Sequence, residues 1–101
     1  MIRHIVLFGK RPDVSDDQID ALIDSIRALE GIIPEIRFYE VVRDEIGAER
    51  SATFGVFSHF DDYDALQRYR DHPDHQNVLA TIRELTEWSK AWDFTIPANH
   101  S

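Results

Sequence analysis

Residues that could do acid–base chemistry gather in residues 69–75, which read Y-R-D-H-P-D-H. Pro73 has no backbone N–H and suits the first position of a helix, and it favours an extended conformation for His72. The start of a helix disfavours a cation, so it disfavours the protonated form of His75. An imidazole has an unperturbed pKa of about 6.5. We therefore expect His75 to be neutral at pH 7 and able to act as a general base.

The apolar residues around this stretch predict which way its side chains point. Tyr69 shares a helix face with Leu66, and His75 precedes a stripe with the spacing of one helix face. That stripe consists of Val78, Leu79, Ile82 and Leu85. Both Tyr69 and His75 are therefore expected to face the core. From the residues alone, His75 is either a general base or a core histidine that holds the helix start.

A metal site at the two histidines is a further possibility that the sequence disfavours. His72 and His75 have a spacing that could ligate a metal, but only Asp71 and Asp74 lie near as further ligands and cysteine is absent. No glycine-rich phosphate loop or serine nucleophile motif occurs. We expect no metal and no cofactor.

Composition limits the class of protein and its partners. The chain has 101 residues, of which 43% are hydrophobic, and this fits one domain with one core. Its net charge of −8 argues against binding to nucleic acid or to anionic lipid, because both require basic patches. The first apolar run, residues 5–8, is too short to span a membrane. With no cysteine in the chain, we expect a cytoplasmic protein.

The periods of the apolar residues predict an alternation of strands and helices. Residues 1–10 are apolar on both alternating sets, which predicts a strand covered on both faces. Ser15 is a good N-cap for the next helix, whose apolar stripe ends near Gly31, the expected C-cap. The later elements are strands at 36–43 and 53–60, helices at 63–69 and 73–87, and a strand at 88–96 that ends at Pro97.

This order predicts a ferredoxin-like β-α-β-β-α-β fold of the α+β class, with a four-stranded antiparallel sheet and helices on one face. The uncovered face is also apolar, because Trp92, Phe94 and Ile96 share one side of the last strand. An apolar sheet face of this size marks an interaction surface. We therefore expect a homodimer formed through the sheets; the alternative is a monomer with scattered exposed aromatic residues.

Several motifs together resemble the stress-responsive A/B barrel (Dabb) family. They are I-R-H-I-V-L-F at the start, P-D-V-S-D-D-Q, I-I-P-E-I-R, F-D-D-Y-D-A-L and Y-R-D-H-P-D-H. The resemblance covers residues 1–97, which leaves residues 98–101 as a frayed tail. It implies a dimeric α+β barrel in which each subunit keeps a small pocket between its sheet and its helices.

The resemblance also implies candidate roles for individual residues. Most members of the family have no assigned reaction, but some resemble polyketide cyclases that close a ring by intramolecular aldol chemistry. In those proteins the last His of H-P-x-H is the base and the Tyr six residues before it holds the substrate, which correspond here to His75 and Tyr69. The resemblance also implies that the His4 side chain faces the pocket. An apolar Phe54 departs from the cyclase pattern, because it offers no hydrogen-bonding group.

These inferences predict one site with a polar end and apolar walls. His4, Tyr69 and His75 would supply the polar groups, and the walls would come from Val6, Phe8, Phe54, Leu79 and Ile82. Three functions fit such a site. The first is binding of a small apolar or carbonyl-containing molecule, the second is cyclase-like catalysis with His75 as base, and the third is a purely structural role in stress.

Overall fold

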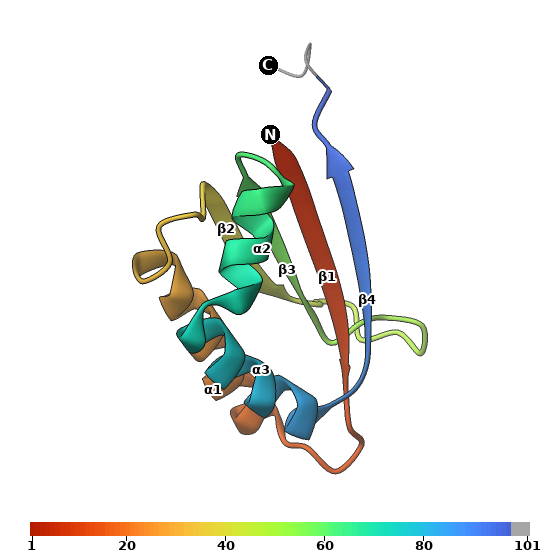
Figure 1. Cartoon of the computed structure of the whole chain (residues 1–101). Coiled ribbons are helices and arrows are strands. Elements are labelled where there is room, and N and C mark those ends of the chain that lie inside the picture. The colour runs from red at the N-terminus through yellow and green to blue at the C-terminus, as the bar shows by residue number, and fades with distance from the viewer. Residues whose placement is uncertain (98–101) are drawn as a thin grey trace.

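The computed structural model describes residues 1–97, so the tail expected at 98–101 lies outside the described residues. Within that range, four strands form one sheet and three helices form one layer against it (Figure 1). The elements are β1 (Ile2–Lys10), α1 (Asp16–Arg27), the 3₁₀ turn η1 (Ala28–Gly31), β2 (Phe38–Arg43), β3 (Phe54–Phe60), α2 (Tyr63–Asp71), α3 (Pro73–Leu85) and β4 (Thr86–Thr95).

The sheet confirms the predicted ferredoxin-like topology. Its strand order is β2-β3-β1-β4 and every neighbouring pair is antiparallel. β1 lies between β3 and β4, with His4 opposite Ser58 on one side and Asp93 on the other. The second predicted helix is divided into α2 and α3. β4 forms the edge of the sheet that lies farthest from α1 and α2 in Figure 1.

Local signals in the sequence explain where α1 begins, but the predicted end of this helix was wrong. The Ser15 hydroxyl accepts a hydrogen bond from the Gln18 backbone N–H at 3.2 Å, and the Gln18 side chain accepts one from the Ser15 N–H at 2.9 Å. Gly31 is not the C-cap of α1, because the helix ends at Arg27 with Ala28 as its C-cap and the chain continues as η1. This 3₁₀ turn buries Leu29, so packing rather than a left-handed glycine decides how the helix ends.

His72 and Pro73 divide the second helical region as the sequence predicts. His72 is extended, with φ −61° and ψ 134°, and its Nδ1 accepts a hydrogen bond from the Asp74 N–H at 3.1 Å. It therefore ends α2 and caps α3 at the same residue, while Pro73 occupies the first turn. α3 ends at Leu85 and β4 begins at Thr86, two residues earlier than predicted.

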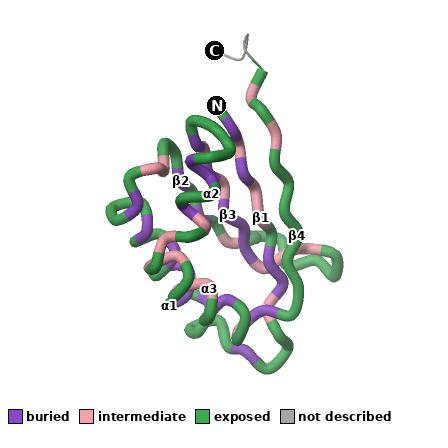
Figure 2. Tube along the Cα trace, viewed as in Figure 1, coloured by how far each residue is buried: buried purple, intermediate pink, exposed green. Residues whose placement is uncertain are grey.

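The two faces of the sheet differ in burial, and so do its strands: Figure 2 shows β3 mostly buried and β4 mostly exposed. The core lies between the helices and the strand residues that face them, with Phe54, Phe60 and Leu66 among its fully buried side chains. On the opposite face, Leu7 is 38% exposed and Trp92 is 66% exposed. The prediction that β1 is covered on both faces is therefore wrong for a single chain, because all three helices pack on the same side.

Candidate functional site

A cavity of about 370 Å³ lies between the helices and the helix-facing side of the sheet. Most of its wall is apolar and comes from the sheet, α1, η1 and α3, namely Val6, Phe8, Ile26, Leu29, Val56, Val78, Leu79 and Ile82. Its polar groups include His4 on β1, Tyr69 on α2 and His75 on α3. The structure thus brings these three predicted side chains to one cavity, with Val6, Phe8, Leu79 and Ile82 around them.

Phe54 does not take the position that we predicted for it. Its ring stacks on Phe8 with 4.9 Å between the ring centroids and 19° between the planes, and it is not among the residues that line the cavity. Phe8 therefore separates Phe54 from the cavity. Alternation along a strand correctly placed Phe54 on the helix-facing side, but it could not show that a neighbouring ring would cover it.

Tyr69 reaches the cavity from the C-terminal part of α2. Its ring packs against that of Phe60, with 4.8 Å between the ring centroids. Its hydroxyl and that of Tyr39 on β2 share a hydrogen bond of 2.8 Å, and both residues are buried. Burial raises the pKa of both phenols, so both stay protonated at neutral pH. Because one hydrogen bond uses only one of the two protons, the pair keeps a second O–H that can donate to another acceptor.

His75 lies in the first turn of α3, and its ring centroid is 4.4 Å from that of Tyr69. Its Nδ1 is buried and has no hydrogen-bond partner among the described residues. The Arg70 carbonyl is close enough to raise the pKa of His75, although that carbonyl makes its hydrogen bond with the Gln76 side chain, at 2.6 Å. Burial has the larger effect and lowers the pKa of His75 below its usual value. The ring is therefore neutral at pH 7.

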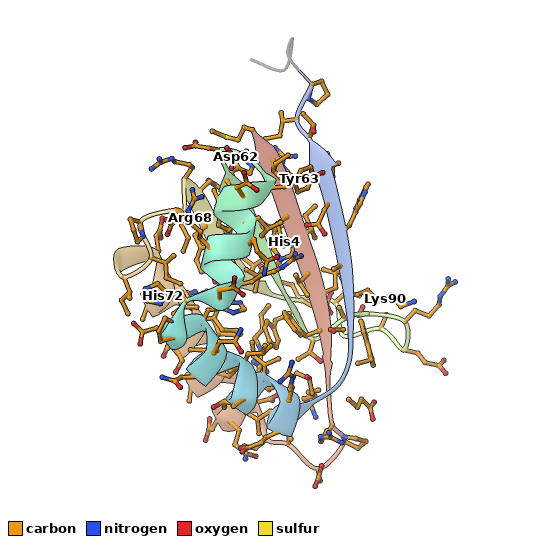
Figure 3. All side chains as sticks on the ribbon, viewed as in Figure 1. His4, Asp62, Tyr63, Arg68, His72 and Lys90 are labelled. Carbon is orange, nitrogen blue, oxygen red and sulfur yellow. The ribbon has the colours of Figure 1, made fainter. Side chains whose placement is uncertain are left out.

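His4 faces the same cavity from β1, between the sheet and α2 (Figure 3). Its Nδ1 is hydrogen-bonded to a carboxylate oxygen of Asp93, the residue opposite it on β4. Burial lowers the pKa of His4, although the Asp93 carboxylate opposes this shift. A neutral His4 then donates its Nδ1 proton to Asp93. The other carboxylate oxygen of Asp93 lies 3.8 Å from the guanidinium of Arg70.

Three residues that the sequence did not single out belong to this arrangement: Tyr39, Arg70 and Asp93. Tyr39 alternates with Val41 on a strand, so the period of two could have placed it on the inner face. Asp93 becomes relevant only through its pairing with His4, which depends on the register of β1 and β4. No local pattern in the sequence gives that register.

A protein-family model described as the stress responsive A/B barrel domain, or Dabb, matches residues 2–96 of the chain. This protein belongs to the Dabb family. An uncharacterized protein of Streptomyces coelicolor is 39% identical over 90 residues, which is 87% of the present chain and 93% of that protein.

Solved structures show that the fold recurs among other proteins. A dimeric ferredoxin-like protein of unknown function from Thermobifida fusca is 34% identical and has a TM-score of 0.86, covering 94% of this chain and 90% of that one. The hydroxynitrile lyase of Passiflora edulis is 19% identical with a TM-score of 0.85, covering 99% of this chain and 96% of that one. At that identity the likeness to the lyase shows a shared fold alone.

Two further observations concern possible membrane and metal binding. None of the helices within residues 1–97 has the length and apolar character that crossing a membrane requires. The same residues contain no group of three or more histidine or acidic side chains placed to hold a metal ion. His72, the first histidine of the H-x-x-H pair, is instead engaged as the N-cap of α3.

Proposed function

We propose that this Dabb protein is a homodimeric binding protein that takes a small, largely apolar molecule with a carbonyl or hydroxyl oxygen into the cavity of each subunit. The observation that carries the proposal is the buried Nδ1 of His75, which has no partner among the described residues and belongs to a residue that lines a largely apolar cavity. A buried polar atom without a partner costs free energy, and a ligand atom that pairs with it removes this cost.

The chemistry of the cavity supports a ligand with one oxygen-bearing end. The hydroxyl pair of Tyr69 and Tyr39 keeps one O–H for an acceptor, and the neutral His75 offers a ring nitrogen beside it. The remaining wall is mostly aliphatic, with Phe8 at one side. A ketone or hydroxyl oxygen at the polar end would leave the apolar body against this wall.

The outer face of the sheet supports the homodimer. This face carries Ile5, Leu7, Phe57, Trp92 and Phe94. The ring centroids of Trp92 and Phe94 are 5.2 Å apart. A monomer would leave this patch in water. The Thermobifida fusca relative is described as dimeric, which supports a dimeric state here. We place the protein in the cytoplasm, in keeping with its lack of cysteine.

A second candidate function is general acid–base catalysis on a carbonyl compound, such as cyclase-like aldol ring closure. It is favoured by the neutral state of His75, since a general base must be unprotonated, and by the contact of its ring with Tyr69. In this reaction His75 would remove a proton next to the carbonyl, and Tyr69 would donate a hydrogen bond to the oxygen that gains charge.

Titration with acetophenone, a small aryl ketone, followed by amide NMR, tests the binding proposal. We expect saturable shifts confined to the residues around His4, Tyr69 and His75. Leu79→Trp should abolish them because the indole fills the cavity, whereas Ile46→Trp should not, because Ile46 is 82% exposed in a loop. Shifts that do not saturate, or that survive Leu79→Trp in a folded protein, would contradict the proposal.

A further inference from the structure

Arg70 is a charged group at the cavity, beside the polar groups of Tyr69, His4 and His75. It lies one residue after Tyr69 on α2 and lines the cavity near the His4–Asp93 pair. Its closest acidic partner is Asp93, at 3.8 Å between Nη2 and Oδ2, which is beyond hydrogen-bonding distance. The Asp93 oxygen bonded to His4 is the other one. The planar donor edge of the guanidinium is therefore open to a carboxylate.

The surrounding charges favour a ligand with a single negative charge. Arg70 and Asp71 are the formally charged side chains among the described residues that line the cavity, and Asp71 is exposed and accepts a hydrogen bond from Gln67 at 3.0 Å. His4 and His75 add no charge when neutral. One guanidinium matches one carboxylate, while Asp71 in the lining and Asp93, 3.8 Å from Arg70, would repel a second negative charge.

The charge of Arg70 also reaches the polar groups of the site. Burial has the largest effect on the pKa of His4, Tyr69 and His75, but the positive charge of Arg70 acts on all three and lowers each value. The Asp93 carboxylate acts in the opposite direction and raises the pKa of His4. The field at the polar end therefore has a positive contribution that extends from His4 to His75 and attracts an anion.

From this arrangement we infer that the ligand is a small monocarboxylic acid, with its carboxylate on the Arg70 guanidinium and its aliphatic or aromatic body in the apolar part of the cavity. This inference rests on the proposed binding function and names the class of ligand. It assigns Arg70 as the residue that distinguishes an acid from a neutral molecule of the same shape.

The test compares 3-phenylpropanoate with 3-phenylpropanamide, which differ in charge but hardly in size, by calorimetric titration at pH 7. Wild-type protein should bind the acid roughly tenfold to a hundredfold more tightly, the effect of a hydrogen bond to a charged group. Arg70→Gln should reduce this preference to within about twofold, since it removes the charge that produces the preference.

Arg68→Gln is the matched control. It removes the same charge from the same helix, but Arg68 pairs with Glu35 at 3.2 Å and lies on the other side of α2 from His4 (Figure 3). The preference for the acid should survive this change. Equal binding of acid and amide by wild-type protein, or equal effects of the two variants, would overturn the assignment of Arg70 while leaving the binding function standing. Binding of neither compound to wild-type protein would contradict both.

Discussion

At the scale of single residues, the site depends on histidines that burial keeps neutral. His4 is 6% exposed, and its Nδ1 is hydrogen-bonded to Asp93. The buried Nδ1 of His75, by contrast, has no partner in the part of the chain that the structure describes. The two rings line the same cavity, but they differ in whether Nδ1 already has a hydrogen-bond partner. His4 is held in place by its carboxylate, and His75 is left free to interact with a ligand.

The lowered pKa of His75 predicts a specific dependence of stability on pH. Because burial lowers its pKa in the folded state, the unfolded chain binds a proton more readily near pH 6.5, and acid favours unfolding. This contribution to stability is present above pH 6.5 and is lost as the pH falls through the folded pKa. We expect the melting temperature to fall between pH 7 and pH 5, and to fall less steeply in His75→Gln. Proton NMR of the His75 ring should give a pKa below 6.5, and a value above it would contradict the account.

The hydrogen bond between Tyr39 and Tyr69 predicts coupled effects of mutation. Either Tyr→Phe change leaves the other buried hydroxyl without its partner, at a cost of roughly 1 to 3 kcal/mol of unfolding free energy. The double variant should cost less than the sum, because it leaves no orphaned hydroxyl. Urea unfolding of the three variants measures this difference, and strictly additive losses would show that the two hydroxyls do not interact.

At the scale of elements, the break between α2 and α3 at His72 shapes the site. It brings the ring of Tyr69 on α2 into contact with the ring of His75 on α3. His72 caps α3 with a ring nitrogen, an uncommon way to satisfy the Asp74 N–H. Pro73 then fixes the direction in which α3 leaves the break. Replacement of the cap should therefore affect the start of α3 before it affects the rest of the fold.

His72→Ala should destabilise the protein by roughly 0.5 to 2 kcal/mol, the typical cost of losing an N-cap, whereas His72→Ser should retain most of the stability because serine is a good cap. Hydrogen exchange of the amides of α3 shows where the loss occurs. The account expects faster exchange in the first turn of α3 in the alanine variant. Equal stability of wild type and the alanine variant would show that the cap contributes nothing.

Local chemistry predicted most of the elements, and the rest depended on contacts between segments distant in the sequence. Ser15 and Pro73 mark helix starts, the first through its side-chain cap and the second through its backbone preference, so these two starts could be predicted. The exclusion of Phe54 from the cavity could not, because it depends on the position of the Phe8 ring. The same holds for the role of Asp93, which the register of β1 and β4 decides.

At the scale of the whole molecule, the sheet face that no helix covers and the cavity lie on opposite sides of one sheet. The helices cover the side with His4, while Trp92 and its neighbours face outward. Dimerisation through the outer face would leave the cavity of each subunit intact. It would also bury a large apolar area, on the order of 2,000 Å² in total for a stable dimer.

Trp92→Glu should shift the protein from dimer to monomer, because it places a charge in the proposed apolar interface. Tyr63→Glu is the control, since Tyr63 is exposed on α2 in the helix layer. Sedimentation velocity at micromolar concentration distinguishes the two states. A monomeric wild-type protein, or a Trp92→Glu variant that sediments as a dimer, would contradict the proposed interface.

Binding of a ligand in the cavity beside His75 is tested most directly by a crystal structure of the protein grown in saturating acetophenone. The account predicts electron density for the ketone between the apolar wall and the polar end. Its oxygen should lie within hydrogen-bonding distance of Tyr69 or His75. A cavity that holds only ordered water, or ketone bound solely on the outer face of the sheet, would contradict the account.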